Sequence, residues 1–196
     1  MKIKQAHLVT PAIACLIATL MFMPSFGLQE DAAQKVNSSM DMLKSEAAKL
    51  GPAKVEGTDR VADKEVPAIY FGRTKMNNNF ELVDDVVKKE GGTVSIFVKS
   101  GDEYVRVATN VKKDDGSRAM GTILDPKGKV IVNIRNNEAF YGEATILGRA
   151  YITGYEPIRD SANNVIGIYY VGYPKEQVKA AAPASSSSKM DEEIRR

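Results

Sequence analysis

The hydrophobic and polar positions of this 196-residue chain change their period once, from helical to strand-like. In the N-terminal half, apolar residues recur at steps of three and four until Gly51-Pro52 interrupts the run. This spacing predicts an amphipathic helix over residues 29–50 that packs along one side of a domain. Its apolar stripe consists of Ala33, Val36, Met40, Leu43 and Ala47.

A second, shorter helix is expected before the period changes. Asn79 is a candidate cap, Phe80, Val83 and Val87 share one face, and Gly91 ends the run. The chain between the two helices, residues 51–78, contains several glycines and prolines, which favours irregular chain with short ordered pieces.

After Gly92 the apolar positions alternate, which is typical of strands. Short turns such as "SGDE", "KKDDGS" and "SANN" separate most of the runs, and such turns favour antiparallel pairing. An antiparallel sheet is therefore predicted from five runs: "TVSIFVK", "YVRVATNV", "YGEATIL", "AYITGYEPIRD" and "VIGIYYVGY". Residues 125–137 stay ambiguous, because Asp125-Pro126 favours a helix start whereas the β-branched run that follows favours a strand.

Both ends of the chain differ from this pattern. Residues 1–27 carry two lysines, then an apolar stretch, then small residues, as in a secretory signal peptide, with an uncleaved anchor as the alternative. Residues 175–196 are polar and serine-rich, which predicts a disordered tail. A single domain over 28–174 is therefore expected, exported to the periplasm or secreted, with no second membrane segment after it.

Removal of the predicted signal peptide would change the net charge and the set of side chains that remain for catalysis or metal binding. Of the 27 basic residues, two lie in residues 1–27, so the mature chain has 25 basic and 25 acidic residues and no basic excess for nucleic acid. His7 and Cys15, the only histidine and cysteine, also lie there. Their loss excludes a Ser-His-Asp triad, a cysteine nucleophile and His or Cys metal sites. No cofactor, metal or catalytic residue is predicted.

Arg106 stands inside the run "YVRVATNV". Strict alternation puts Val105, Val107 and Val111 on the helix side of the sheet, and Arg106 on the other side with Tyr104 and Asn110. A guanidinium in that place suits a carboxylate ligand through two parallel hydrogen bonds. The alternatives are a solvated arginine or one paired with Asp102 or Glu156.

The order of motifs in the strand region resembles a known family. "GGTVSIFV", "VRVATNV", "DGSRAMGT", "LGRAYITGYEPI" and "VIGIYYVGY" are similar in sequence and order to the single Cache domains of bacterial periplasmic sensors, of the Cache 3/Cache 2 fusion type. The resemblance covers about residues 66–174. It implies an α+β, PAS-like fold, with an antiparallel sheet of five to six strands and a long N-terminal helix, and a helix near 125–136, where this chain departs by being β-branched.

The resemblance also implies a function. Such domains bind small organic acids or amino acids over one sheet face, drive a membrane-bound histidine kinase or chemoreceptor, and form dimers through the N-terminal helix. The candidate ligand-binding residues are Arg106, Arg118, Tyr141, Tyr151 and Tyr155. Arg118 has a turn-flanking role as its alternative, and the tyrosines have ordinary strand packing.

Two function hypotheses follow from these residues and the resemblance. The first is a periplasmic sensory domain for small carboxylates or amino acids, acting through a partner in signal transduction or chemotaxis. The second is an accessory protein that has lost its ligand and docks on a membrane sensor through helix 29–50. An enzyme is the least favoured class, because no histidine or cysteine remains for acid–base or nucleophilic roles.

Overall fold

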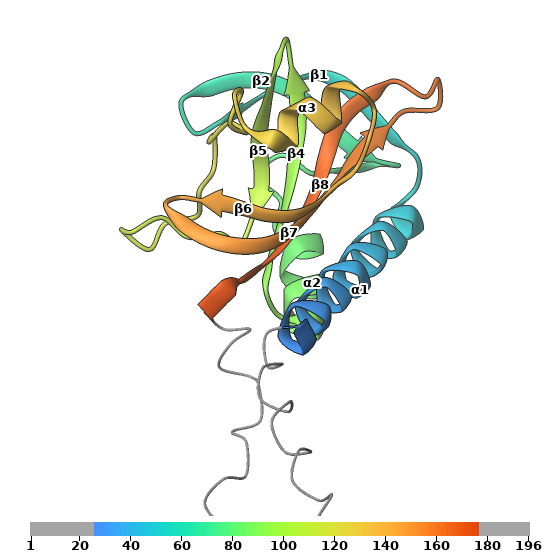
Figure 1. Ribbon diagram of the computed structural model, residues 1–196. Coiled ribbons are helices and arrows are strands. Elements are labelled where there is room, and N and C mark those ends of the chain that lie inside the picture. Colours follow the sequence, from blue (N-terminus) through green and yellow to red (C-terminus); the bar gives the residue numbers. More distant parts are fainter. Residues whose placement is uncertain (1–25, 177–196) are drawn as a thin grey trace, which may run out of the picture.

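The computed structural model describes the backbone of residues 26–176 and the side chains from residue 32 onward. Helix α1 (Phe26–Leu50) lies along a five-stranded sheet, as Figure 1 shows. The predicted stripe is confirmed at four positions, but Ala32 is buried in place of Ala33, which faces solvent. The signal peptide predicted at 1–27 and the tail predicted at 175–196 fall outside the described residues except for two residues each.

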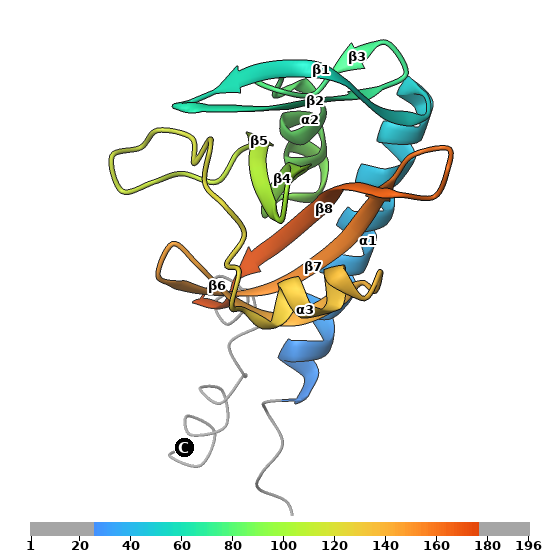
Figure 2. The same ribbon diagram turned by 90° about the horizontal axis from the view of Figure 1, so that it is seen from above.

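Residues 51–78 form a second sheet, so the expectation of irregular chain was wrong. Strands β1 (Ala53–Val61), β2 (Lys64–Phe71) and β3 (Thr74–Lys75) pair in the order β1-β2-β3 and lie as a layer at one end of the molecule (Figure 2). Pro67 pairs with Thr58 directly after a register shift that contains Gly57, whose φ is 69°. A bulge tolerates a residue without an N–H, so the glycine and proline sit within the strands and do not break them.

Helix α2 (Glu81–Glu90) matches the second predicted helix. The N-cap position is Phe80, one residue after the predicted cap Asn79, although the Asn79 side chain accepts a hydrogen bond from the Glu81 N–H at 3.1 Å. Gly91, with φ at 78°, ends the helix and donates its N–H to the Val87 carbonyl.

The five predicted strands form one antiparallel sheet in the order β5-β4-β8-β7-β6, which confirms the α+β, PAS-like class. The last strand pairs with the first, so the two runs farthest apart in this part of the sequence lie at its centre. The strands are β4 (Thr93–Ser100), β5 (Glu103–Thr109), β6 (Phe140–Ile146), β7 (Arg149–Arg159) and β8 (Val165–Pro174).

The two faces of this sheet carry separate hydrophobic clusters. We call the face covered by α1, α2 and the β1–β2 hairpin the closed face; its cluster includes Leu43, Val83 and Val105. We call the other the cleft face; its cluster includes Phe97, Tyr155 and the buried residues of α3 (Lys129–Arg135).

Within the ambiguous segment 125–137, helix α3 covers residues 129–135, although this run is rich in β-branched residues. Val130, Ile131 and Ile134 are buried, and Val132 is 57% exposed, which is helical spacing. Tertiary packing on the cleft face therefore overrides the weak strand preference of the run.

No described helix is both long and apolar enough to cross a membrane. Across residues 26–176, no group of three or more His, Cys, Asp or Glu side chains is arranged to hold a metal ion.

Candidate functional site

A cleft of about 520 Å³ opens on the cleft face, between the sheet and the segment that leads into α3. Strand β5 contributes Arg106, β7 contributes Tyr155, and β6 with its turn forms the opposite wall. Residues 122–125 and 128–130 complete the lining. Its size lies within the range of small-molecule sites, about 300–1,000 Å³. We call it the Arg106 cleft.

Arg106 is held in place from both its backbone and its side chain. Its N–H donates to the Thr122 carbonyl at 2.9 Å, and its own carbonyl accepts from Gly121 at 3.0 Å, so the segment pairs with the outer edge of β5. The guanidinium Nη1 donates to the Thr122 hydroxyl oxygen at 3.0 Å, and that hydroxyl donates to the Ala119 carbonyl at 2.9 Å. The orientation of the guanidinium is therefore fixed without a ligand.

The electrostatic position of Arg106 is unusual, because the residue is 5% exposed and forms no ion pair within the described part of the chain. Its Nε is buried and has no hydrogen-bond acceptor. The guanidinium carbon lies 4.8 Å from the ring centre of Phe97 and 6.0 Å from that of Tyr170. Burial lowers the pKa of Arg106, but an arginine stays charged at neutral pH. The site therefore holds a desolvated positive charge that one hydroxyl and two aromatic rings stabilise in place of a carboxylate.

Two tyrosines stand beside this charge. Tyr155 lines the cleft, and its ring centre lies 4.9 Å from that of Tyr170 on the neighbouring strand. Burial raises the pKa of both phenols, so both hydroxyls keep their protons at neutral pH. Tyr151 is 7% exposed in the same cluster, but it is not among the residues that line the cleft.

Tyr141 lies apart from the cleft. It is 44% exposed, and its hydroxyl donates to Glu156 at 2.5 Å, which in turn binds Lys44 of α1 at 2.7 Å. A methyl group at Gly154 would contact both the Tyr141 ring and Val36 of α1, so Tyr141 packs on the α1 side of the sheet.

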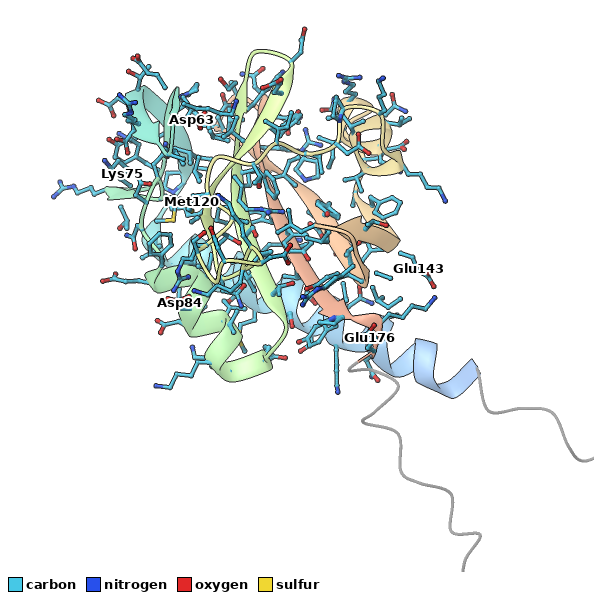
Figure 3. All side chains as sticks on the ribbon, turned by 90° about the vertical axis from the view of Figure 1, so that its left-hand side faces the viewer. Asp63, Lys75, Asp84, Met120, Glu143 and Glu176 are labelled. Carbon is cyan, nitrogen blue, oxygen red and sulfur yellow. The ribbon has the colours of Figure 1, made fainter. Side chains whose placement is uncertain are left out.

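Arg118 also lies apart from the cleft and ties two elements together. Its guanidinium forms two hydrogen bonds to Asp84 of α2, at 2.8 and 2.7 Å, and a third to the Thr109 carbonyl at 2.6 Å. It covers the Phe80 ring at 4.3 Å. In Figure 3, Asp84 lies on α2 and Glu143, a cleft residue, lies beside β6 at the other side of the view.

The predicted side-chain directions along β5 are confirmed for Arg106, Val105 and Val107, but Val111 lies in the cleft-face cluster. Ile96 pairs with Ala108 whereas Phe97 pairs with Arg106, so Val107 is an extra residue in the ladder. Such a bulge shifts the alternation by one beyond that point.

Two residues that the sequence analysis placed beside Arg106 form their hydrogen bonds elsewhere. Asn110 accepts the Val94 N–H and donates to the Gly92 carbonyl, so its amide serves the end of β4. Glu156, a possible partner of Arg106, binds Lys44 instead.

Three residues near the Arg106 charge were missed by the sequence analysis as site residues: Phe97, Thr122 and Tyr170. The alternation of "TVSIFVK" already places Phe97 opposite Val94, Ile96 and Val98. Thr122 carries no such signal, because the segment that contains it pairs with the sheet edge outside any regular strand.

One protein family and several solved structures are similar to this chain. Residues 26–189 match the family described as the Cache 3/Cache 2 fusion domain. No curated protein matches the sequence. Among solved structures, the E. coli DcuS sensor domain is similar with a TM-score of 0.39 and 18% identity, over 50% of this chain and 68% of that chain. The sensory domain of the Campylobacter jejuni chemoreceptor Tlp3 has a TM-score of 0.40 and 12% identity, over 79% of this chain and 63% of that chain.

Proposed function

The chain belongs to the Cache 3/Cache 2 fusion domain family, and on that premise we propose that it senses a small organic carboxylate or amino acid in the Arg106 cleft. Cache domains are extracellular or periplasmic sensory domains of a non-enzymatic kind. Binding would be non-covalent, with the ligand carboxylate on the Arg106 guanidinium and the Tyr155 hydroxyl beside it.

The observation that carries the proposal is the buried guanidinium without a carboxylate. A buried charge without an ion partner costs several kcal/mol in general, and a buried donor without an acceptor costs about 1–3 kcal/mol. A ligand carboxylate in the cleft beside the guanidinium would supply the missing negative charge. The cost of the unpaired charge would thus become affinity for an anion.

The open cleft also separates the two function hypotheses. An accessory protein that has lost its ligand is expected to have a filled or collapsed cleft, and about 520 Å³ stays open here. We therefore favour ligand binding. In this proposal the protein is exported, and the ligand-bound domain acts on a membrane-bound histidine kinase or chemoreceptor, with α1 as the contact surface or as a dimer contact.

The test is a thermal-shift screen of small carboxylates and amino acids against the wild-type protein and Arg106→Met. A true ligand raises the wild-type Tm with concentration, by an amount that corresponds to about 2.7 kcal/mol at one hundred times Kd. The Arg106→Met variant should bind the ligand at least about tenfold more weakly than the wild type, because it lacks the charge-assisted hydrogen bonds. Arg73→Met, in the exposed turn between β2 and β3, is the matched control and should bind as the wild type does.

Two outcomes contradict the proposal. One is a ligand that binds Arg106→Met as tightly as the wild type. The other is a large fall in the Tm of ligand-free Arg106→Met, which would mean that the arginine serves the fold.

A further inference from the structure

Beyond Arg106, hydrocarbon side chains form a continuous part of the cleft lining, next to polar residues that include Thr122 and Thr145. Leu124, Val130 and Ile146 are buried, whereas Ile123 and Leu147 are 40% and 47% exposed where the cleft meets solvent. Phe140 adds an aromatic face. A ligand with its carboxylate at Arg106 therefore extends along an apolar wall.

The charges that line the cleft do not suit an amino acid. Besides Arg106 they are Asp125, Lys129 and Glu143, and all three are exposed. Glu143 already binds Lys175 at 2.5 Å, and Asp125 accepts the Lys127 N–H at 2.9 Å.

An ammonium on the carbon next to the ligand carboxylate would lie close to the buried guanidinium. Neither lining carboxylate is buried beside Arg106 to offset the repulsion, and like charges repel strongly where water is excluded. A second carboxylate on the ligand would find only Lys129, which is exposed and therefore screened by solvent.

The turn between β6 and β7 gives a separate reason to expect an apolar ligand. Leu147 and Gly148 have φ values of 47° and 81°, so both are left-handed, as in a type I′ turn. Asn-Gly is the favoured pair there, and leucine is disfavoured because its Cβ crowds the carbonyl. The turn thus carries a residue that its backbone does not favour, and that residue lines the cleft.

From these observations we propose that the ligand is a monocarboxylate with an extended apolar body and with no ammonium beside the carboxylate. This proposal rests on the proposed binding at Arg106 and narrows its ligand class. The carboxylate binds the guanidinium at the floor, and the hydrocarbon body contacts Leu124, Ile146 and Leu147.

The test uses matched pairs of probes in calorimetric titrations of the wild-type protein. Leucine is 4-methylpentanoate with an added ammonium, and hexanedioate is close to hexanoate with an added carboxylate. We expect 4-methylpentanoate to bind at least about tenfold more tightly than leucine, because of the like-charge repulsion at Arg106. Hexanoate should bind more tightly than hexanedioate. From butyrate to hexanoate, each buried methylene should tighten binding about fourfold.

A variant at the turn tests the apolar wall without breaking the fold. Leu147→Asn places a favoured residue at a left-handed position, so the Tm without ligand should stay equal or rise. This variant should bind hexanoate several-fold more weakly and acetate as tightly as the wild type does, because acetate has no hydrocarbon chain that reaches Leu147. Arg106→Met should weaken the binding of every carboxylate.

The outcomes distinguish the two proposals. If leucine or hexanedioate binds more tightly than its partner, and binding still needs Arg106, the monocarboxylate proposal is wrong and the Arg106 site stands. If hexanoate binds Leu147→Asn as tightly as the wild type, the apolar wall has no role and the ligand class is again wrong. If no carboxylate binds, or binding ignores Arg106, the proposed function fails as well.

Discussion

The two faces of the five-stranded sheet are built from the same strands and have opposite chemistry. On the closed face, α1, α2 and the β1–β2 hairpin pack apolar side chains together with little exposed surface. On the cleft face, α3 and the segment before it leave a cleft of about 520 Å³ over a buried arginine and paired tyrosines. One face therefore supplies most of the packing, and the other carries the groups suited to recognition.

Arg118 and Arg106 show the same contrast in one residue type. Arg118 has a carboxylate partner, a carbonyl partner and an aromatic ring, and it joins α2 to the chain that follows β5. Arg106 has aromatic rings and one hydroxyl acceptor but no carboxylate. A guanidinium that is fully paired serves the fold, whereas one that is positioned but unpaired is available to a ligand.

The largest expected effect is on the closed face. Leu43→Ala should lower the free energy of unfolding by about 2–5 kcal/mol, because Leu43 is fully buried in α1 against the sheet. Ile146→Ala, at the wall of the cleft, should cost less than about 2 kcal/mol, since that side chain already borders open space. Urea denaturation measures both, and equal losses would break the distinction between the faces.

Alkaline pH should be the next largest effect. Burial raises the pKa of Tyr155, Tyr169 and Tyr170 above the unfolded-state value of about 10. The folded state favours the protonated phenols, so their full contribution to the free energy of unfolding is present below about pH 10. Above that pH, each tyrosine lowers the free energy of unfolding by about 1.4 kcal/mol per pH unit, because its phenol loses the proton in the unfolded chain before it does so in the folded chain.

Phenylalanine substitutions measure this effect of alkaline pH separately for a tyrosine on each face of the sheet. Tyr155→Phe and Tyr169→Phe should each move the alkaline unfolding midpoint to higher pH. Only Tyr155→Phe should also weaken ligand binding, because Tyr169 stacks on Phe71 at 5.8 Å on the closed face. A midpoint that stays in place in both variants would show that these tyrosines do not control alkaline unfolding.

Arg118→Met should have a smaller effect, of about 1 kcal/mol. The pair with Asp84 is partly exposed, with 25% and 45% of the two side chains accessible, and solvent screens such pairs. Thermal unfolding measures the loss, and Asp84→Asn is the matched variant, which should lose about as much. Full stability in both would mean that the segment after β5 is held by its backbone pairing alone.

The smallest expected effect on stability is that of Arg106→Met. Replacement of a buried, unpaired charge by an apolar side chain of similar length should leave the ligand-free Tm unchanged or raise it. Thr122→Val is the informative companion, because it keeps the charge, removes its acceptor and also removes the donor to the Ala119 carbonyl, and it should cost about 1–3 kcal/mol. The double variant should recover only the part of that loss that comes from the acceptor of Arg106; a loss as large as in Thr122→Val alone would mean that the bond to Ala119 accounts for all of it.

Much of the fold could be predicted from the sequence, because the relevant signals are local. The alternation that places Arg106 opposite Val105 and Val107 has a period of two and needs no knowledge of neighbours. The same signal failed at Val111, where a bulge opposite β4 shifts the pattern. It also failed over residues 51–78, because Gly57 and Pro67 indicate loops unless the bulge that accommodates them is known.

The candidate site could be predicted only in part. The strand pattern indicated Arg106 and Tyr155 as candidates. It could not distinguish them from Arg118 and Tyr141, which bind Asp84 and Glu156 away from the cleft. Each of those partners is at least 15 residues away along the chain, so no local pattern reports it.

The sequence by itself determined the direction of most side chains along the regular strands, since side-chain direction within a strand is a local property. Only the tertiary structure decided which of two arginines has a carboxylate partner, that Tyr155 meets Tyr170, and that a strained Leu147 faces the cleft. The physical reason is that pairing depends on the register of distant strands and on how α3 covers the sheet. These are set by the packing of the whole domain and not by any one segment.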